Sequence, residues 1–450
     1  MDKFSALKYY YGYDTFKEGQ AEVIDQLLDG RDALCIMPTG AGKSVCYQIP
    51  ALLQSGTTIV VSPLISLMKD QVNTLLQMDI SAAYINSSLS LQEYRETLRE
   101  MKQNGYRIVY VAPERLHSEA FLKVCSQIQI PFLAVDEAHC ISQWGQDFRP
   151  SYLTIRDFTE RLPDRPTIGA FTATATPDVR QDIEELLDLE DPFSVTTTFD
   201  RPNLSFTVRH PDSKDKELLR TLKGRRDQSG IVYCSKRKDV ERVCDMLNAR
   251  GFEATRYHAG LDDKERMENQ DDFIFDRKRI MVATNAFGMG IDKSDVRMVI
   301  HIDCPDSLEA YFQEAGRGGR DGEKAYAVLL YNQSDENKLM KRIDETFPDK
   351  EFIKDVYEHL AYFFQVAVGS GMGQTFMFEI EKFCFTYKYF PTRVDSALRI
   401  LERSGYIHYE DNPDGKARIR FNISRNDLYL LENVSEKEES VITGLLRNYG

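Results

Sequence analysis

Short, continuously apolar runs alternate with amphipathic helical patterns along most of the chain. Continuous apolar runs of this length indicate strands buried on both faces, because half-exposed strands alternate apolar and polar residues. Parallel strands need a crossover between them, and the intervening stretches have helical spacing. The pattern therefore predicts an α/β chain built on doubly wound parallel sheets. The predicted strands of the first series span residues 32–37, 57–62, 107–112, 132–137 and 167–174.

A second series of the same kind begins after the segment Phe-Asp-Arg-Pro at residues 199–202. Two series of strands and helices predict two α/β domains in tandem. We therefore predict a first domain over residues 1–203, a second over 204–335, and a region of different character over 336–450. The predicted strands of the second series span residues 230–235, 253–258, 279–285, 296–303 and 325–331.

The C-terminal region has mostly helical patterns, first over residues 335–368. Further along, an amphipathic helix ends at Gly405 and a strand pattern follows it. A turn at residues 413–415 then leads into a second strand over 417–423. A helix followed by a hairpin is the outline of a winged helix, and the alternative is a small helical cap with an incidental hairpin. We predict a helical region of the winged-helix type.

The net charge and the cysteines limit the class of protein. Lys and Arg number 57 and Asp and Glu 71, so the net charge is −14. This excludes a generally basic nucleic-acid binder, but a local basic groove remains compatible with a nucleic-acid enzyme. The eight cysteines include no C-x-x-C pair, and no apolar stretch is long enough to span a membrane. We expect reduced thiols, no membrane contact, and a cytoplasmic protein, nucleoid-associated if it is bacterial.

The segment MPTGAGKS, residues 37–44, follows a predicted strand and precedes a predicted helix. Its last three residues match the end of the phosphate-binding loop pattern G-x-x-x-x-G-K-[ST], although Met37 stands where the first glycine would be. Glycines let the loop turn its backbone N–H groups toward phosphate oxygens, and the helix N-terminus favours an anion. Lys43 would reach the β- and γ-phosphates and Ser44 would bind Mg²⁺. The candidate nucleotide ligands in this loop are Thr39, Gly40, Gly42, Lys43 and Ser44.

Two acids follow the predicted strand at 132–137, in the sequence LAVDEAH. Ligands of parallel sheets bind at the carboxyl ends of the strands, where these acids lie. Asp136 is suited to hold Mg²⁺, and Glu137 can accept a proton from an attacking water.

The segment YFQEAGRGGRDG, residues 311–322, carries Arg317 and Arg320 among glycines. If the segment is helical, this three-residue interval lets both guanidinium groups reach one anion. We interpret the two arginines as groups that stabilise transition-state charge from the second domain.

Together these segments resemble a superfamily 2 helicase and, within that group, the RecQ family of DNA helicases. In this resemblance MPTGAGKS is motif I, for which Met in the first position is common in the family, and Gln20 is the residue that contacts adenine. The further matching segments are Phe16–Gln20, Val60–Val72, Asp136–His139, Cys140–Tyr152, Phe171–Thr176, Phe199–Leu204, Ile231–Glu241, Tyr257–Leu261, Val282–His301 and Gln313–Gly322.

The resemblance implies two RecA-like P-loop domains that bind ATP and Mg²⁺ between them. It further implies 3′→5′ translocation on single-stranded DNA and unwinding of forked DNA in recombination or repair, and we expect a monomer. The alternatives are an RNA helicase and a nucleic-acid-stimulated ATPase or translocase that does not unwind. The chain departs from the family beyond the second domain, where the family has a zinc site of four cysteines. Because only Cys384 lies beyond Cys304, we predict no zinc site.

Cys140–Tyr152 resembles the aromatic-rich loop of the family and contains the only tryptophan of the chain, Trp144. Phe148 and Arg149 lie close by in the sequence. Bases stack on aromatic rings and on guanidinium planes, at about 1–3 kcal/mol per base. We predict that these three side chains bind DNA and report strand occupancy to the nearby acids. The alternative is that Trp144 and Phe148 are ordinary core residues.

Overall fold

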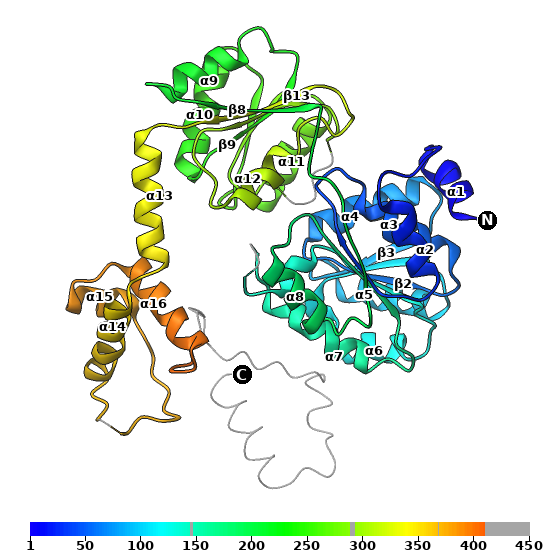
Figure 1. Cartoon of the computed structure of the whole chain (residues 1–450), viewed down its shortest axis with the longest axis horizontal. Helices are drawn as coiled ribbons and strands as arrows, with labels where there is room; N and C mark the ends of the chain where they lie inside the picture. The colour runs from blue at the N-terminus through cyan, green and yellow to red at the C-terminus, as the bar shows by residue number, and fades with distance from the viewer. Residues whose placement is uncertain (145–146, 289–292, 368, 410–450) are drawn as a thin grey trace. The chain divides into compact units, whose positions relative to one another are not determined.

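The computed structural model describes residues 1–144, 147–288, 293–367 and 369–409. The chain divides into two compact units, Met1–Leu339 and Met340–Gly450. The first unit holds two parallel sheets, which Figure 1 shows in blue to cyan and in green to yellow. The predicted fold class, two parallel α/β domains followed by a helical region, is therefore confirmed. No helix in the described ranges is long and apolar enough to cross a membrane.

The first sheet has seven parallel strands in the order β3-β4-β2-β5-β6-β1-β7. All five predicted strands are present, and the sequence analysis missed the edge strands β3 and β7. The strands are β1 Ala33–Ile36, β2 Thr58–Val61, β3 Ala82–Ile85, β4 Ile108–Val111, β5 Phe132–Val135, β6 Thr167–Thr172 and β7 Phe193–Thr196. The loop that follows β1 and the acids that follow β5 therefore lie at the same edge of the sheet.

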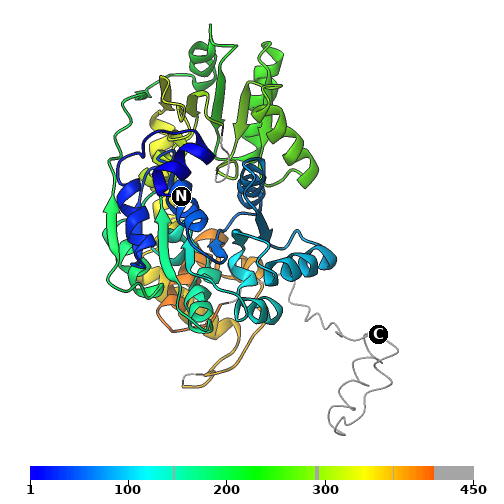
Figure 2. The ribbon, with the colours of Figure 1, turned by 90° about the vertical axis from the view of Figure 1, so that its right-hand side faces the viewer.

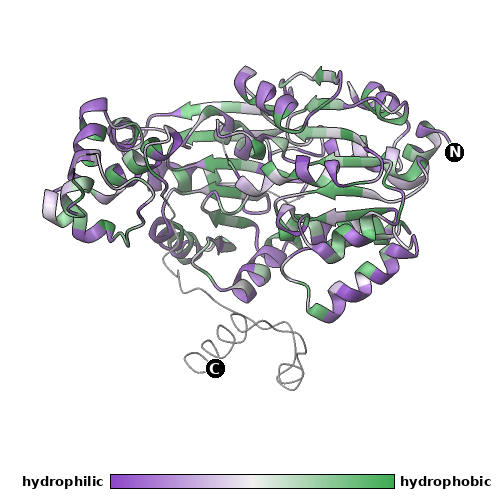
Figure 3. Ribbon diagram, turned by 90° about the horizontal axis from the view of Figure 1, so that it is seen from below, coloured by the Kyte–Doolittle hydropathy of each residue, from purple (hydrophilic) through white to green (hydrophobic). Residues whose placement is uncertain are grey.

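Helices cover both faces of this sheet, which explains why its inner strands are continuously apolar. Figure 3 shows the strands mainly green and the outward helix faces mainly purple. One face is covered by α2 Gln20–Leu28, α3 Lys43–Leu53 and α4 Ile65–Gln77. The other face is covered by α5 Leu91–Lys102, α6 Glu119–Cys125, α7 Thr154–Glu160 and α8 Pro177–Leu186. Short helical turns complete the domain: α1 Lys3–Ala6, η1 Leu7–Tyr11, η2 Pro113–Arg115, η3 Ala138–Ile141 and η4 Pro150–Leu153.

The second sheet has six parallel strands in the order β10-β11-β9-β12-β13-β8. Its first strand in the sequence, β8, is an edge strand that the sequence analysis missed. The strands are β8 Leu204–Arg209, β9 Ser229–Tyr233, β10 Ala254–Tyr257, β11 Ile280–Ala283, β12 Val296–His301 and β13 Ala325–Leu330. Helices α9 Lys214–Leu222 and α10 Arg237–Ala249 pack on one face, and α11 Asp263–Ile274 and α12 Leu308–Ala315 belong to the other.

The C-terminal part is helical as predicted. Its helices are α13 Gln333–Thr346, α14 Lys350–Phe363, α15 Ile380–Tyr387 and α16 Pro391–Arg403. Buried residues of α14, α15 and α16, among them Val356, Phe383 and Leu398, form one core. The left-handed residue Lys388 ends α15, and α16 starts three residues later. The predicted amphipathic helix is thus α16, whereas most of the predicted hairpin lies outside the described residues and the winged helix stays a prediction.

Candidate functional site

The glycine-rich loop between β1 and α3 presents the N-terminus of an 11-residue helix. Gly40 and Gly42 have φ of +84° and +86°, which non-glycine residues rarely adopt. Gly42 is the N-cap of α3, and no side chain caps the first amides of the helix. Uncapped N–H groups at the positive end of a helix dipole form a site for an anion. The predicted phosphate loop therefore has the backbone geometry that its sequence requires.

The side chain of Gln20 supports this loop from behind. Gln20 is buried, and its Nε2 atom donates to Ala41 O at 3.0 Å and to Gly42 O at 3.1 Å. Its Oε1 atom accepts a hydrogen bond of 2.8 Å from the backbone N–H of Lys17. A Cβ atom on Gly42 would lie 2.6 Å from Gln20 Nε2, so a larger residue there would displace this amide. Gln20 thus organises the loop in this structure, and its contact with adenine stays a prediction.

Two further predicted ligands of the loop, Lys43 and Ser44, are half-buried at the start of α3. Lys43 and Ser44 are the first two residues of this helix, so both side chains belong to its first turn. Lys43 Nζ donates to Met37 O at 3.2 Å, within the same loop. The ammonium group is therefore held next to the uncapped amides, where positive charge adds to the attraction for phosphate.

Asp136 and Glu137 follow β5 directly. Asp136 is buried, its backbone N–H donates to Val61 O, and its carbonyl oxygen accepts from Tyr152 Oη at 2.9 Å. Burial, followed by the neighbouring Glu137 carboxylate, raises the pKa of Asp136 well above its usual range, and Lys43 lowers it. A buried carboxylate in this setting is stabilised by a nearby cation.

Glu137 has φ 48° and ψ 46°, a left-handed backbone that costs a non-glycine residue energy. Strain of this kind persists where the surrounding structure fixes it, and it is often found at functional sites. The backbone N–H of Glu137 donates to Asp136 Oδ1 at 3.0 Å, whereas the Glu137 side chain lies beside His139, with Oε2 3.4 Å from Nδ1. The two carboxylates can therefore serve different roles.

His139 completes the acidic turn, and sequence reasoning assigned it no role. Its ring is buried, its Nδ1 atom lies 2.8 Å from Thr172 Oγ1, and the same Nδ1 atom lies 3.4 Å from Glu137 Oε2. The Thr172 hydroxyl donates to Thr174 O, so its single hydrogen is already used. His139 Nδ1–H is therefore the donor to Thr172. Burial lowers the pKa of His139, which keeps the ring neutral at neutral pH.

Arg317 and Arg320 do not lie on a helix, which corrects the geometry considered for them. Helix α12 ends at Ala315, and residues 316–322 form turns because Gly316 and the glycines beyond it break the helical pattern. Arg317 is buried, and its guanidinium group packs against Gly288. A Cβ atom added to Gly288 would lie only 3.0 Å from Arg317 Nη2. Arg320 is half-buried. The two arginines are therefore placed by the turn and not by a shared helix face.

This turn, residues 316–320, lies beside the phosphate loop. A Cβ atom on Gly316 would be 3.5 Å from Thr39 Cβ, and one on Gly40 would be 3.4 Å from Arg320 Cγ. Arg201, for which the sequence analysis had no role, touches both segments: it donates to Thr39 O at 3.1 Å and to Gly319 O at 2.8 Å. The structure thus brings together the phosphate loop and the arginine turn, which lie far apart in the sequence.

The predicted DNA-binding residues lie on the loop that follows the acidic turn. Trp144 has 73% of its surface exposed, which argues against a core role, and Phe148 is half-buried. Arg149 donates to Pro63 O at 2.9 Å and forms an ion pair of 2.9 Å with Asp147. This arginine therefore fixes the loop to the segment after β2, and Trp144 is the member of the set that is open to a partner.

Comparison with known proteins agrees with this arrangement. Residues 17–183 match the DEAD/DEAH box helicase family, and residues 213–322 match the helicase conserved C-terminal domain. The chain is 46% identical over 362 residues to the ATP-dependent DNA helicase RecQ of Bacillus subtilis, covering 80% of this chain and 61% of that protein. It is also 46% identical over 325 residues to the RecQ helicase of Pasteurella multocida, covering 72% of this chain and 51% of that protein.

This chain belongs to the RecQ family. It spans about half to three fifths of the length of these two RecQ relatives. The helicase Lhr of Mycobacterium smegmatis, solved with single-stranded DNA and AMP-PNP, is similar in fold, with a TM-score of 0.61 and 21% identity. That likeness covers 73% of this RecQ chain and 48% of the solved chain. RecQ membership implies use of ATP and Mg²⁺.

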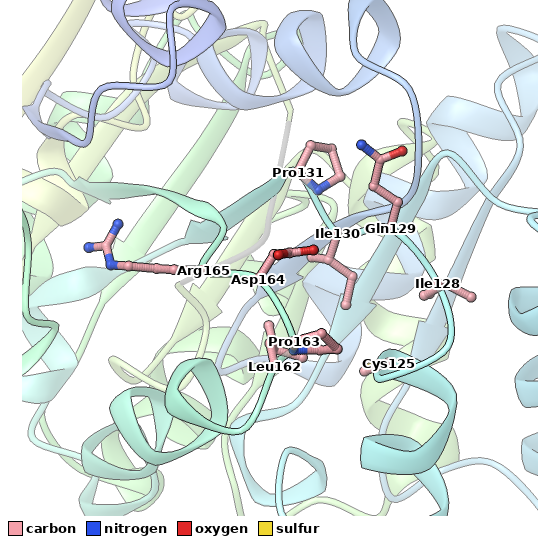
Figure 4. Close-up of a pocket in the computed structure, with 9 residues that line it drawn as sticks. All are labelled: Cys125, Ile128, Gln129, Ile130, Pro131, Leu162, Pro163, Asp164 and Arg165. Carbon is pink, nitrogen blue, oxygen red and sulfur yellow. The ribbon is translucent and has the colours of Figure 1, made fainter.

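Figure 4 shows a cavity of the chain and nine of the residues that line it. It has a volume of about 240 Å³, and its lining includes Pro131 and Arg165. These two residues precede β5 and β6, so the cavity is at the amino ends of the strands. The phosphate loop and the acids are at the carboxyl ends, and the cavity is therefore not part of the candidate site.

Proposed function

We propose that this chain is an ATP-driven motor that moves along single-stranded DNA and unwinds duplexes with 3′→5′ polarity. The observation that carries the proposal is the meeting of the phosphate loop with the arginine turn, since Gly40 and Arg320 are in contact range. A nucleotide held by both segments would favour one arrangement of the two domains, and hydrolysis would release it. The names of the RecQ relatives support DNA as the substrate.

The first domain holds the triphosphate in this proposal. Backbone amides of Thr39, Gly40 and Gly42 and of the first turn of α3 face the phosphates, and Lys43 supplies a positive charge. Ser44 and Asp136 are the residues that would hold Mg²⁺. The uncapped helix end fits the phosphates, and the buried Asp136 carboxylate is the group that the cation would stabilise. Bound Mg²⁺ would neutralise phosphate charge during hydrolysis.

Hydrolysis depends on groups from both domains. Glu137 is the proposed general base for the attacking water, because its Oε2 atom is buried and accepts no hydrogen bond in the described structure. Arg320, beside Gly40, is the proposed stabiliser of transition-state charge. Arg317 packs toward Gly288 in this structure, so we propose that it joins Arg320 when nucleotide is bound.

DNA occupies the aromatic-rich loop in this proposal. Trp144 stacks on a base, and Phe148 and Arg149 hold the loop in place. Because this loop follows the acidic turn directly in the chain, base stacking can alter Asp136 and Glu137. We further propose that the protein acts as a monomer on single-stranded and forked DNA, and that it contains no structural zinc. Metal analysis of the purified chain tests the last point: one zinc per chain would overturn it.

A strand-displacement assay tests the function. We expect the wild type to unwind a DNA fork with a 3′ tail when ATP and Mg²⁺ are present, and not a fork with only a 5′ tail. Lys43→Ala should abolish both unwinding and ATP hydrolysis, because the charge facing the phosphates is removed. ATP hydrolysis without strand displacement would support a translocase instead. Equal activity on an RNA fork would overturn the assignment to DNA.

A further inference from the structure

Arg201 lies between β7 and β8, and carbonyl oxygens surround its half-buried guanidinium group. The Nη2 atom donates to Gly318 O at 3.0 Å and to Gly319 O at 2.8 Å. The Nη1 atom donates to Gly316 O, in the second domain, at 3.4 Å and to Thr39 O, in the first domain, at 3.1 Å. One side chain therefore binds the backbone of the arginine turn and the backbone of the phosphate loop at the same time.

The chemistry of this contact is specific to arginine. Its planar guanidinium carries five N–H donors in a fixed fork, whereas lysine offers one compact ammonium group. The partners of Arg201 in the described structure are neutral oxygens, the fifth being Asn203 Oδ1 at 3.4 Å. Burial lowers the pKa of Arg201, but an arginine stays protonated at any physiological pH. The charge is thus held in place by carbonyl dipoles.

Asn203 and Lys17 lie nearby, and each of them supports only one of the two segments: Asn203 supports the arginine turn and Lys17 supports the phosphate loop. Asn203 Nδ2 donates to Gly319 O at 2.7 Å and to Glu323 O at 2.9 Å, both in the second domain. Lys17 Nζ donates to Gly40 O at 2.9 Å, within the first domain. Of these three residues, Arg201 is the one whose side chain binds both the arginine turn and the phosphate loop.

We infer that Arg201 is a positioning residue that sets the arginine turn against the phosphate loop. The three turn carbonyls that it binds flank Arg317 and lead into Arg320, and the fourth carbonyl belongs to Thr39, next to Gly40. Arg201 therefore sets the position of Arg317 and Arg320 relative to the phosphate loop, and so to the phosphates of a nucleotide bound there. This inference rests on the proposed function, because it assigns Arg201 a part in ATP hydrolysis.

The first test separates turnover from binding. Arg201→Ala should lower the kcat of ATP hydrolysis by about a hundredfold, because a displacement of about 1 Å at a catalytic group has an effect of that size. The affinity for ADP, measured by titration with a fluorescent analogue, should change by no more than about twofold, since ADP is held by the first domain. Arg201→Lys should stay at least tenfold below wild type, because it keeps the charge and loses the fork.

Matched variants show whether the link between the segments matters. Asn203→Ala removes support of the arginine turn alone, and Lys17→Met removes support of the phosphate loop alone. Each should lower kcat by less than Arg201→Ala does. Arg226→Ala, which removes an exposed arginine bound to Arg250 O, should behave as wild type. A loss in Asn203→Ala as large as in Arg201→Ala would show that turn rigidity is sufficient, and would overturn the inference.

A second readout does not depend on turnover. ADP with beryllium fluoride mimics the γ-phosphate, so it should raise the melting temperature of the wild type more than ADP alone. Arg201→Ala should keep the rise caused by ADP and lose the additional rise. An additional rise equal to that of the wild type would overturn the inference. The melting temperature without ligand shows whether the variant is folded, and Arg201→Lys provides the same measurement if the alanine variant is not.

The two proposals fail in different ways. If the wild type hydrolyses ATP and Arg201→Ala does so equally well, the positioning role is wrong and the proposed function stands. If the wild type does not hydrolyse ATP, the proposed function is wrong. In that case the melting measurement with beryllium fluoride still decides whether Arg201 links the two segments around a nucleotide.

Discussion

His139 donates a hydrogen bond of 2.8 Å from Nδ1 to Thr172 Oγ1, and this bond joins the turn after β5 to the end of β6. These two strands are neighbours in the first sheet. The same histidine nitrogen lies 3.4 Å from Glu137 Oε2. His139 thus connects the turn that carries the proposed base to β6, which ends at Thr172.

Replacing Thr172 with valine should weaken this connection. Valine has the shape of threonine without the hydroxyl, so a buried His139 N–H loses its acceptor, at about 1–3 kcal/mol of stability. We also expect slower ATP hydrolysis, because Glu137 loses a fixed neighbour. Thermal unfolding and steady-state phosphate release measure the two effects. Thr174→Val is the control, since the two hydrogen bonds between Thr174 and the Thr172 hydroxyl use only the backbone carbonyl and N–H of Thr174. Equal stability of the two variants would contradict the prediction.

Glu137→Gln should separate nucleotide binding from hydrolysis. The amide cannot accept a proton, so phosphate release should fall by about 10²–10⁴-fold, the contribution that general base catalysis makes. Nucleotide affinity should be retained, because Gln20, Lys43 and the helix N-terminus are unchanged. A fluorescent nucleotide titration and a phosphate-release assay give the two quantities. Hydrolysis at half the wild-type rate would show that another group is the base.

Trp144→Ala should keep basal ATP hydrolysis and lose its stimulation by single-stranded DNA. The exposed ring contributes stacking of about 1–3 kcal/mol per base, and its removal leaves the hydrogen bonds of Asp136 and Glu137 intact. The measurement is the rate of ATP hydrolysis as a function of DNA concentration. Phe275→Ala removes another exposed aromatic ring, 66% exposed, and should be stimulated normally. Normal stimulation of Trp144→Ala would remove the coupling role.

The inner strands were predictable because helices cover both of their faces. The sequence analysis missed β8 for the opposite reason: it is an edge strand, and its Phe206 and Val208 are exposed. β8 therefore does not show the continuous apolar run that revealed the inner strands. The phosphate loop and the acids were predictable as well, because each motif is local and follows a strand.

The contacts between motifs were not predictable in the same way. Arg201 binds Thr39, 162 positions away, and the carbonyl of Gly319, 118 positions away. Such a bond depends on where two loops meet, and the sequence around Arg201 shows no sign of its partners. A role for His139 could have been suspected, because the histidine belongs to the DEAH segment. Its hydrogen bond to Thr172 could not, because the direction of that bond depends on the Thr172 hydroxyl donating to Thr174 O.

A buried ion pair fixes the start of α13 to the second domain and gives the last prediction. Lys214, the first residue of α9, lies 2.7 Å from the carboxylate of Asp335, and both side chains are largely buried. Lys214 also donates to Ile302 O, and Asp335 accepts from the backbone N–H of Asn332 at 2.8 Å. Lys214→Met should therefore destabilise the second domain by about 3–5 kcal/mol, because it leaves the buried carboxylate with only the more distant and exposed Lys338 ammonium, at 3.8 Å.

A double-mutant cycle with Asp335 identifies the cause of the destabilisation. Asp335→Asn removes the charge, so Lys214→Met with Asp335→Asn should be more stable than Lys214→Met alone. Calorimetric unfolding of the wild type, the two single variants and the double variant measures the difference in stability. Arg156→Ala, which breaks an exposed i,i+4 pair with Glu160, should leave the unfolding temperature unchanged. If the double variant is as unstable as Lys214→Met, the loss comes from the packing of the lysine side chain and not from the carboxylate that has lost its nearest cation.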